Sequence, residues 1–381
     1  MSVLDDDQLA LQQGARGLLS SRHPIAVVRA GAGTELGCSP ELWREIGAAG
    51  WPGIIHGEAT GGAGGGLLDL VAVTFELGRH LVTSPLVPSA VVGATVLAHV
   101  AGDDHRLGAL VTGASVMAPA LRRATGQLDT ERSDVIATAT ATGWRLDGET
   151  TLVAHVAASD ALLVLARLGA AGGPGLFVVT PTTAGVTTTR LANLGDQPLS
   201  HVAFEAVEVG APDGFVDVER NRAALAAALA LQTVLVGAAV VGIGERLLEL
   251  TVDYALDRSQ FGRPIGSFQA VQYLCSDIAI STHLLKSLVL KAGRDADGVG
   301  DGWPVSAALV GAHGATVART IAHSAHEVFA GLGFMEEHDL HLYSRRLKHL
   351  EIEFGERRRH DDAIVRHLVT SGAGATAGPT A

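Results

Sequence analysis

The first residues of the chain show the spacing of apolar positions that is typical of an α-helix. Apolar and long side chains mark one helix face at Leu9, Gln12, Arg16 and Leu19. Pro24 ends this run, because proline cannot continue a helix. The same period recurs at Glu41–Ala49, Leu67–Leu81 and Ala90–Val100. We therefore predict an N-terminal helical domain over residues 1–112.

Short β-type segments follow from about Ser115. They are rich in Val, Thr and Leu, and turn residues such as Asp147-Gly148 and Pro181 separate them. The segments are Asp134–Thr142, Gly143–Leu146, Ala161–Ala166, Gly175–Thr180, Gly185–Thr189 and Val202–Val209. This pattern predicts a middle antiparallel β domain over residues 113–215.

Long helical patterns return from Val218 to about Thr370, in four or five segments. The run Ala223–Ile243 has only Gln232 and Thr233 as polar side chains and is long enough to cross a membrane. Because it is Ala-rich and a periodic polar helix follows it, we predict a buried helix of a soluble bundle and no membrane association. This C-terminal bundle should cover residues 216–370, and the low-complexity residues 371–381 should be a disordered tail.

The segregated order of helices, strands and helices predicts an α+β fold of separate domains rather than an alternating parallel sheet. No GxGxxG sequence follows a strand, so a nicotinamide-binding Rossmann unit is not supported. The chain has 381 residues, of which 47% are hydrophobic and 18% charged, and this is ample for a large core.

The formal net charge of −12 argues against a nucleic-acid partner, because no basic stripe could neutralise phosphates. An anionic ligand would need a few Arg residues or helix N-termini. Cys38 and Cys275 have no CxxC spacing, and the N-terminus is acidic rather than signal-like. We therefore expect a cytoplasmic protein.

Two local patterns suggest ligands but are better explained structurally. The Gly-rich stretch Gly57–Gly66 could cradle a phosphate, yet it lacks the Lys-Ser/Thr ending of a P-loop, so we expect a connector. His338 and His341 share a helix face as metal ligands would. We nevertheless predict no metal site.

Three stretches resemble the acyl-CoA dehydrogenase family in order and spacing. They are GAAGWPGIIHGEATGGAGGGLLDLVAVTFELGRHLVTSPLVPSA from Gly47, DYALDRSQFGRPIGSFQAVQYLCSDIA from Asp253 and HEVFAGLGFMEEHDLHLYSRR from His326. The resemblance implies a helical domain, a β domain and a C-terminal four-helix bundle that forms tetramers. It also implies α,β-desaturation of an acyl-CoA by FAD, with electrons passing to an electron-transfer flavoprotein.

Within the RxxFG motif, the resemblance places Arg258 on the diphosphate of a neighbouring subunit's FAD, where a guanidinium can fork onto phosphate oxygens. It likewise makes Gln260, Phe261 and Gln269 cofactor contacts. A salt bridge of Arg258 with Asp253 or Asp257 and a solvent-facing Gln260 remain open alternatives.

A second FAD contact is implied at Glu327 and Gly331, which correspond to the family's Gln-x-x-Gly-Gly-x-Gly pattern. Here Glu replaces the Gln, and Ala330 replaces the first Gly. A carboxylate near pyrophosphate is unfavourable unless it faces a hydroxyl or a cation.

The β domain departs further from the family. Met117-Ala118 precede Pro119 where the family has Thr-Glu-Pro, and Leu152–His155 replace the Trp-Ile/Val-Thr segment beside the flavin. Hydroxyl donors to the flavin ring are therefore missing from both places.

The catalytic base is ambiguous. An ungapped count from Leu342-Tyr343 gives Glu353, whereas aligning the following Gly gives Phe354, which cannot abstract a proton. Glu353 could also be an exposed helical carboxylate. The family's other base position falls on Gln232, which lacks basicity and could instead line the acyl cavity.

Three functions fit these features. The favoured one is a subunit with a degenerate flavin and base site that pairs with a complete homologue, as in heterotetrameric bacterial enzymes of steroid-derived acyl-CoAs. The alternatives are a self-sufficient FAD-dependent acyl-CoA dehydrogenase, in a homotetramer, and a flavin-dependent oxygenase of the same fold.

Overall fold

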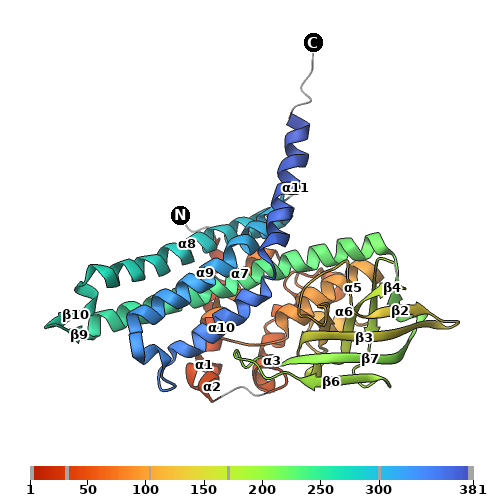
Figure 1. Cartoon of the computed structure of the whole chain (residues 1–381), viewed down its shortest axis with the longest axis horizontal. Coiled ribbons are helices and arrows are strands. Elements are labelled where there is room, and N and C mark those ends of the chain that lie inside the picture. Colours follow the sequence, from red (N-terminus) through yellow and green to blue (C-terminus); the bar gives the residue numbers. More distant parts are fainter. Residues whose placement is uncertain (1–3, 31–33, 103, 170–171, 299–301, 376–381) are drawn as a thin grey trace, which may run out of the picture. The chain divides into compact units, whose positions relative to one another are not determined.

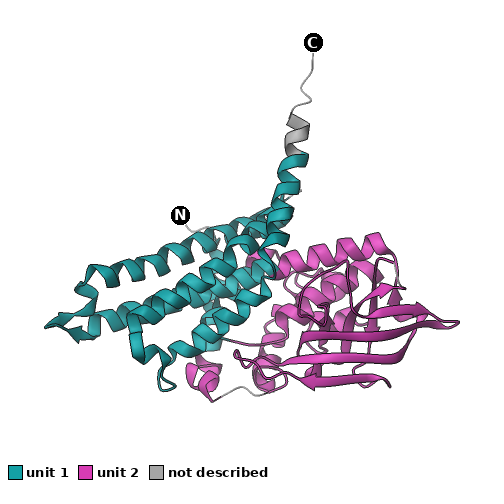
Figure 2. Cartoon of the chain, viewed as in Figure 1, with its two compact units in different colours: residues 1–19, 71–81, 233–381 teal, residues 20–70, 82–232 magenta. Residues whose placement is uncertain are grey.

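Helices and strands follow the predicted order in a computed structural model of the chain (Figure 1). The structure describes residues 4–30, 34–102, 104–169, 172–298 and 302–375. They form two compact units (Figure 2): unit 1 comprises Met1–Leu19, Val71–Leu81 and Thr233–Ala381, and unit 2 comprises Ser20–Leu70 and Val82–Gln232. The predicted boundaries near residues 112 and 215 stay a prediction.

The N-terminal part is helical, as predicted. Ser39 caps one of its helices, because its Oγ accepts a hydrogen bond of 3.1 Å from the Leu42 N–H. The helices are α1 (Asp6–Arg22), α2 (Ile25–Arg29), α3 (Pro40–Ala48), η1 (Trp51–Gly53), η2 (Glu58–Thr60), α4 (Leu67–Arg79), η3 (Leu86–Gly93), α5 (Ala94–Ala101) and α6 (Leu107–Val111).

The middle part forms a sheet in the order β6-β7-β3-β2-β4-β5-β8, with β1 paired to β4. Its strands are β1 (Met117–Ala120), β2 (Ile136–Ala139), β3 (Gly143–Ala154), β4 (Ala161–Leu168), β5 (Pro174–Val179), β6 (Val186–Arg190), β7 (Leu199–Gly210) and β8 (Gly214–Phe215). Most pairs are antiparallel, but β4 pairs in parallel with both β1 and β2. The sheet is therefore mixed rather than antiparallel throughout, and the sequence analysis missed β1 and β8.

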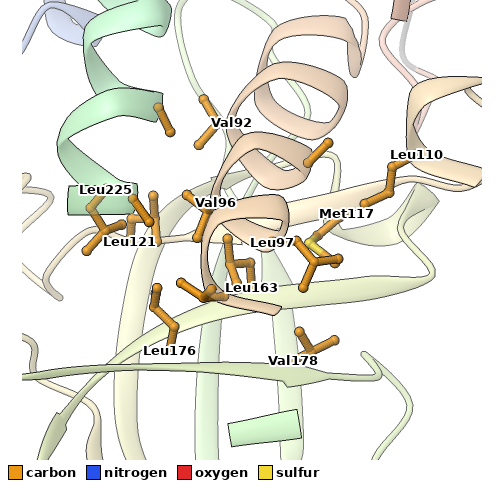
Figure 3. Close-up of a cluster of buried hydrophobic side chains, with 14 of the residues drawn as sticks. Val92, Val96, Leu97, Leu110, Met117, Leu121, Leu163, Leu176, Val178 and Leu225 are labelled. Atoms are coloured by element: carbon orange, nitrogen blue, oxygen red, sulfur yellow. The ribbon is translucent and has the colours of Figure 1, made fainter. Parts of the chain in front are cut away.

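Alternation along β4 and β5 gives unit 2 two cores. Leu163 and Leu176 point to one face, where they meet Val96 and Leu97 of α5 (Figure 3). The intervening Leu162, Val164, Phe177 and Val179 enter a second core formed with β2, β3 and β7. Successive side chains of a strand point to opposite faces, and both faces of these strands are apolar, so both are buried.

The C-terminal segments form the predicted long helices. These are α7 (Val218–Asp257), α8 (Gln269–Asp297), α9 (Trp303–Phe329), α10 (Leu340–Glu353) and α11 (Arg357–Ala375), with short elements β9 (Ser259–Gln260), β10 (Arg263–Pro264), η6 (Ile265–Ser267) and η7 (Ala330–Phe334). The predicted disordered tail begins at residue 371, and residues 376–381 lie outside the described part of the chain.

The apolar run predicted to be a buried helix lies in α7. This is the one helix among the described residues that is long and apolar enough to cross a membrane, with a mean hydropathy of 2.2 in its most apolar window, 67% of which is buried. Gly242 of α7 packs so closely on α4 that a Cβ there would collide with the carbonyl of Phe75. This contact makes α7 a core helix.

Candidate functional site

The RxxFG motif forms a small hairpin after α7. Strands β9 and β10 pair antiparallel, with Gln260 opposite Arg263. The turn residues Phe261 and Gly262 both have positive φ, 54° and 78°, as a two-residue type I′ turn requires. The Ile265 N–H closes the hairpin by donating to the Arg258 carbonyl at 2.8 Å. The motif is therefore a defined surface element.

Arg258 lies at the base of this hairpin with its side chain exposed. Neither Asp253 nor Asp257 pairs with it, and among the described residues no carboxylate lies within salt-bridge distance of its guanidinium. By contrast, Arg263 stacks on the ring of Phe268, with Cζ 4.2 Å from the centroid. Arg258 thus keeps its donors available for an anion outside the described chain.

The other predicted contacts of this motif also lie at the surface. Phe261 is 92% exposed at the tip of the hairpin, although its ring centroid lies 6.0 Å from that of Phe268. The Gln260 amide donates to the Ser259 carbonyl at 2.9 Å, and that of Gln269 donates to the Tyr273 hydroxyl at 2.6 Å. Phe261 therefore adds little to the core of this chain, and its ring is accessible at the surface.

The structure brings the second motif to the same end of unit 1. The rings of Tyr254 on α7 and Phe329 on α9 stack with centroids 4.4 Å apart. Tyr254 also accepts the Arg258 N–H at its carbonyl, at 2.9 Å. Glu327 and Gly331 are exposed on either side of Phe329. Sequence reasoning missed this stack, because only tertiary packing joins the two aromatic residues.

Ala330 carries the strain of a missing glycine. Its backbone has φ 49° and ψ −134°, a conformation that suits glycine and not an L side chain. The resemblance places a glycine at this position. The chain therefore keeps the glycine backbone geometry of the motif without the glycine.

Histidine rings line the connection between α9 and α10. His326 lies against Phe334, with ring centroids 4.6 Å apart, and burial lowers the pKa of His326. His338 accepts the Leu340 N–H at Nδ1, and His341 bonds the His338 carbonyl. Within the described ranges, no group of three or more His, Cys, Asp or Glu residues is arranged to hold a metal.

The two candidate positions for the base differ in burial. Glu353 is the last residue of α10 and is half-buried. Phe354 is fully buried, and its ring packs so closely on α9 that a Cβ at Gly314 would collide with it. The carbonyl of Phe354 also accepts His360 Nε2 at 2.7 Å. Phe354 is a core residue, which leaves Glu353 as the carboxylate of this pair.

Gln232 lies half-buried on α7 and is the last residue of unit 2. Glu353 belongs to unit 1, so the two residues are described in separate units. The proposed role of Gln232 in an acyl cavity stays a prediction.

The segments of unit 2 expected beside the flavin ring are apolar. Met117 and Ala118 on β1 are each 1% exposed and enter the two opposite cores. The Met117 N–H donates to Ser89 Oγ at 2.8 Å. Leu152 of β3 has φ 55° at a register shift, and His155, the residue after β3, has φ 60°. The side chains on β1 therefore provide no hydroxyl donor.

The backbone amides of the Gly-rich stretch Gly57–Gly66 form hydrogen bonds within the chain. The N–H groups of Gly62, Ala63, Gly64 and Gly65 donate to carbonyls of the preceding loop at 2.7–3.1 Å. Because these donors are satisfied within the chain, the loop does not form a phosphate cradle.

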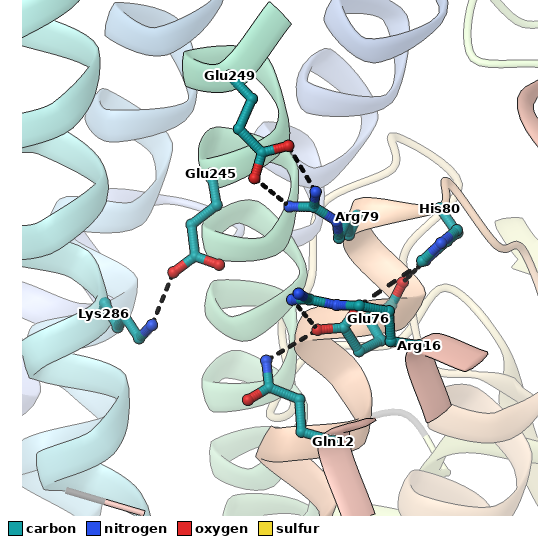
Figure 4. A network of polar contacts seen from close by, with 8 residues as sticks. All are labelled: Gln12, Arg16, Glu76, Arg79, His80, Glu245, Glu249 and Lys286. Atoms are coloured by element: carbon teal, nitrogen blue, oxygen red, sulfur yellow. Dashed lines mark hydrogen bonds and ion pairs between the residues drawn. The ribbon is translucent and has the colours of Figure 1, made fainter. Parts of the chain in front are cut away.

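A charged network fixes α1 and α4 within unit 1 (Figure 4). The buried carboxylate of Glu76 accepts two hydrogen bonds from Arg16, at 2.8 and 3.0 Å, and one from Gln12 at 2.8 Å. Arg79 forks onto Glu249 of α7 at 2.5 and 2.9 Å. Because these charges satisfy one another, the network is structural.

Comparison with known proteins agrees with this geometry. The family pattern "Acyl-CoA dehydrogenase, N-terminal domain" matches residues 5–108, and "Acyl-CoA dehydrogenase, C-terminal domain" matches residues 222–369. Acyl-CoA dehydrogenase FadE27 of Mycobacterium tuberculosis (strain ATCC 25618 / H37Rv) is 30% identical over 331 residues, which cover 83% of this chain and 84% of the relative. The chain belongs to the acyl-CoA dehydrogenase family, whose members typically bind FAD.

Two solved structures match almost the whole chain. A chain of the ChsE4-ChsE5 complex from Mycobacterium tuberculosis is 28% identical with a TM-score of 0.85, over 97% of this chain and 99% of that one. A chain of a Tcur3481-Tcur3483 steroid ACAD variant is 26% identical with a TM-score of 0.83, over the same shares. Both confirm the predicted fold.

Proposed function

We propose that this chain is a subunit of an FAD-dependent acyl-CoA dehydrogenase whose complete active site lies in a homologous partner chain. One observation carries the proposal: Arg258 is exposed on a defined hairpin and forms no ion pair within the described residues. A guanidinium in this position suits the diphosphate of a flavin nucleotide held by another subunit.

The residues of the chain fit the two ends of FAD unequally. The exposed Arg258, Phe261 and Gly331 suit the nucleotide end, where charge and close backbone approach matter. The buried Met117 and Ala118 do not suit the ring, because they offer no hydroxyl where the family uses one. When bound, FAD would supply the hydride-accepting chemistry, and this chain would contribute binding and orientation.

The self-sufficient enzyme is a second candidate, favoured by Glu353. This carboxylate is half-buried at the end of α10, and a carboxylate is the type of group that can accept the α-proton. In either case we propose an acyl-CoA thioester as substrate, an electron-transfer flavoprotein as acceptor and a cytoplasmic location. One similar protein is a steroid ACAD, so steroid acyl-CoA thioesters are the first substrates to test.

The test compares the chain expressed alone with the chain co-expressed with a homologous acyl-CoA dehydrogenase. Alone, it should carry little FAD and reduce no dye with acyl-CoAs, because ring contacts and an activated base are lacking. The co-purified complex should be yellow and active. A yellow, active chain in isolation would refute the subunit role. In that case Glu353→Gln should abolish turnover while flavin stays bound.

A further inference from the structure

Three packed rings join α7, α9 and the connection that leads to α10. Phe329, the last residue of α9, is buried, and its ring contacts two others. The ring of Tyr254 stacks on it with centroids 4.4 Å apart and planes inclined by 18°. The imidazole of His338 packs on it at 4.6 Å, tilted by 49°. His338 is therefore linked to α7 through Phe329.

The connection between α9 and α10 holds His338 in one orientation. It can fold back over Phe329 because Gly333 has no side chain: a Cβ there would lie 2.7 Å from Leu340 Cδ2 and 3.2 Å from the Cβ of Phe329. The His338 N–H donates to the Met335 carbonyl at 3.2 Å, and its Nδ1 accepts the Leu340 N–H at 3.1 Å. Because Nδ1 accepts this bond, the proton of the neutral ring lies on Nε2.

Tyr254 is the large side chain that ties the last turn of α7 to α9. Beside it, Ala255 is buried but small, and Leu256 and Arg258 are exposed. The Tyr254 carbonyl accepts the Arg258 N–H at 2.9 Å, and the Arg258 carbonyl accepts the Ile265 N–H that closes the hairpin. The position of the Tyr254 ring thus sets where Arg258 leaves the helix.

We propose that His338 is a positioning residue for flavin binding: its ring holds Phe329 against Tyr254 and so orients Arg258. This inference rests on the proposed function, in which Arg258 contacts the diphosphate of FAD. His338 acts without touching the cofactor. A guanidinium that is oriented in advance loses less conformational freedom on binding, so the ring stack raises the affinity for FAD.

Two substitutions of His338 separate its ring from its hydrogen bond. His338→Phe keeps an aromatic ring against Phe329 but cannot accept the Leu340 N–H, whereas His338→Asn offers an acceptor and has no ring. Titration of the assembled complex with FAD, followed by flavin fluorescence, gives the dissociation constant of each variant. His338→Asn should raise it about threefold to tenfold, the size of an aromatic pair contact, and His338→Phe should stay near wild type. The reverse order would assign His338 to helix capping and overturn the proposal.

A double-mutant cycle tests whether the ring acts through Arg258. In complexes that carry Arg258→Ala, His338→Asn should change the dissociation constant by less than about twofold, because the group that the ring orients is gone. Full additivity of the two changes would overturn the proposal. Tyr254→Leu removes another ring of the stack and should behave as His338→Asn does. His313→Asn is the matched control, because His313 is exposed on α9 about four turns before Phe329.

The same titrations distinguish failure of this inference from failure of the proposed function. If Arg258→Ala binds FAD as tightly as wild type, the phosphate contact is wrong, and the positioning role is wrong with it. If Arg258→Ala weakens binding but His338→Asn and Tyr254→Leu do not, the phosphate contact stands and only the positioning role of His338 is overturned.

Discussion

The hairpin around Arg258 and the strand β1 around Met117 both carry residues expected to meet a flavin, yet they are built in opposite ways. The hairpin exposes Arg258 and Phe261 and satisfies only its backbone internally. Strand β1 buries Met117 and Ala118 in two cores, and none of its own four residues has a polar side chain. The first region can serve another molecule, whereas the second serves the fold of its own unit.

Under the proposed function, this difference explains how the chain loses the ring end of a cofactor site and keeps the nucleotide end. Apolar substitutions at β1 improve burial, so packing favours them once ring contacts are no longer required. No such gain exists at the hairpin, where exposure of Phe261 is unfavourable for the isolated chain. This exposure supports the proposed contact with another subunit.

The largest expected effect is at the apolar position next to the candidate base. Phe354→Ala should lower the free energy of unfolding by about 3–5 kcal/mol, because it leaves a cavity against α9. Ile352→Ala is the control, since Ile352 is exposed in the last turn of α10, two residues before Phe354. Urea titration measures both. Similar losses for the two variants would mean that Phe354 is not the core residue described above.

Arg258→Ala tests the proposed role of the exposed hairpin in flavin binding. The binding free energy of flavin in the assembled complex should weaken by about 1.5–3 kcal/mol, the range for a charge-assisted hydrogen bond. Arg263→Ala is the matched control in the same hairpin, because Arg263 already stacks on Phe268. Fluorescence of released flavin after dialysis measures both variants. If flavin loss is unchanged from wild type in Arg258→Ala, the proposed phosphate contact is wrong.

Ala330→Gly tests whether the backbone at residue 330 is strained because alanine stands where the family pattern has glycine. The substitution should raise the free energy of unfolding by about 1 kcal/mol, because glycine adopts positive φ without cost. The same change at Ala322 inside α9 should have the opposite sign, a loss of about 1 kcal/mol from helix propensity. Thermal denaturation of the two variants gives both signs. Destabilisation by Ala330→Gly would exclude backbone strain at that position.

Features that depend on interactions between residues close in sequence could be predicted, whereas features that depend on residues far apart in sequence could not. Periodicity and motifs identify the helices, the sheet and the hairpin region, because these signals are local. Strand direction is not local, so the parallel pairing of β4 with β1 and β2 was not foreseen. The stack of Tyr254 on Phe329 depends on how α7 and α9 pack. The choice between Glu353 and Phe354 depends on the direction of side chains in the last turn of α10, which composition does not specify.

Glu327→Gln should have the smallest effect and the opposite sign to Arg258→Ala. If the exposed Glu327 faces the phosphate end of FAD, removing its charge should strengthen the binding free energy of flavin by up to about 1 kcal/mol, the range for exposed charge pairs. The gain should shrink at high salt, because the screening length falls to about 3 Å at 1 M. Glu208→Gln removes another exposed charge, in unit 2, and should change nothing. Flavin titration of the assembled complex at low and high salt distinguishes the cases. A gain that persists at high salt would point to a new hydrogen bond from the amide, and no gain at all would place Glu327 away from the cofactor.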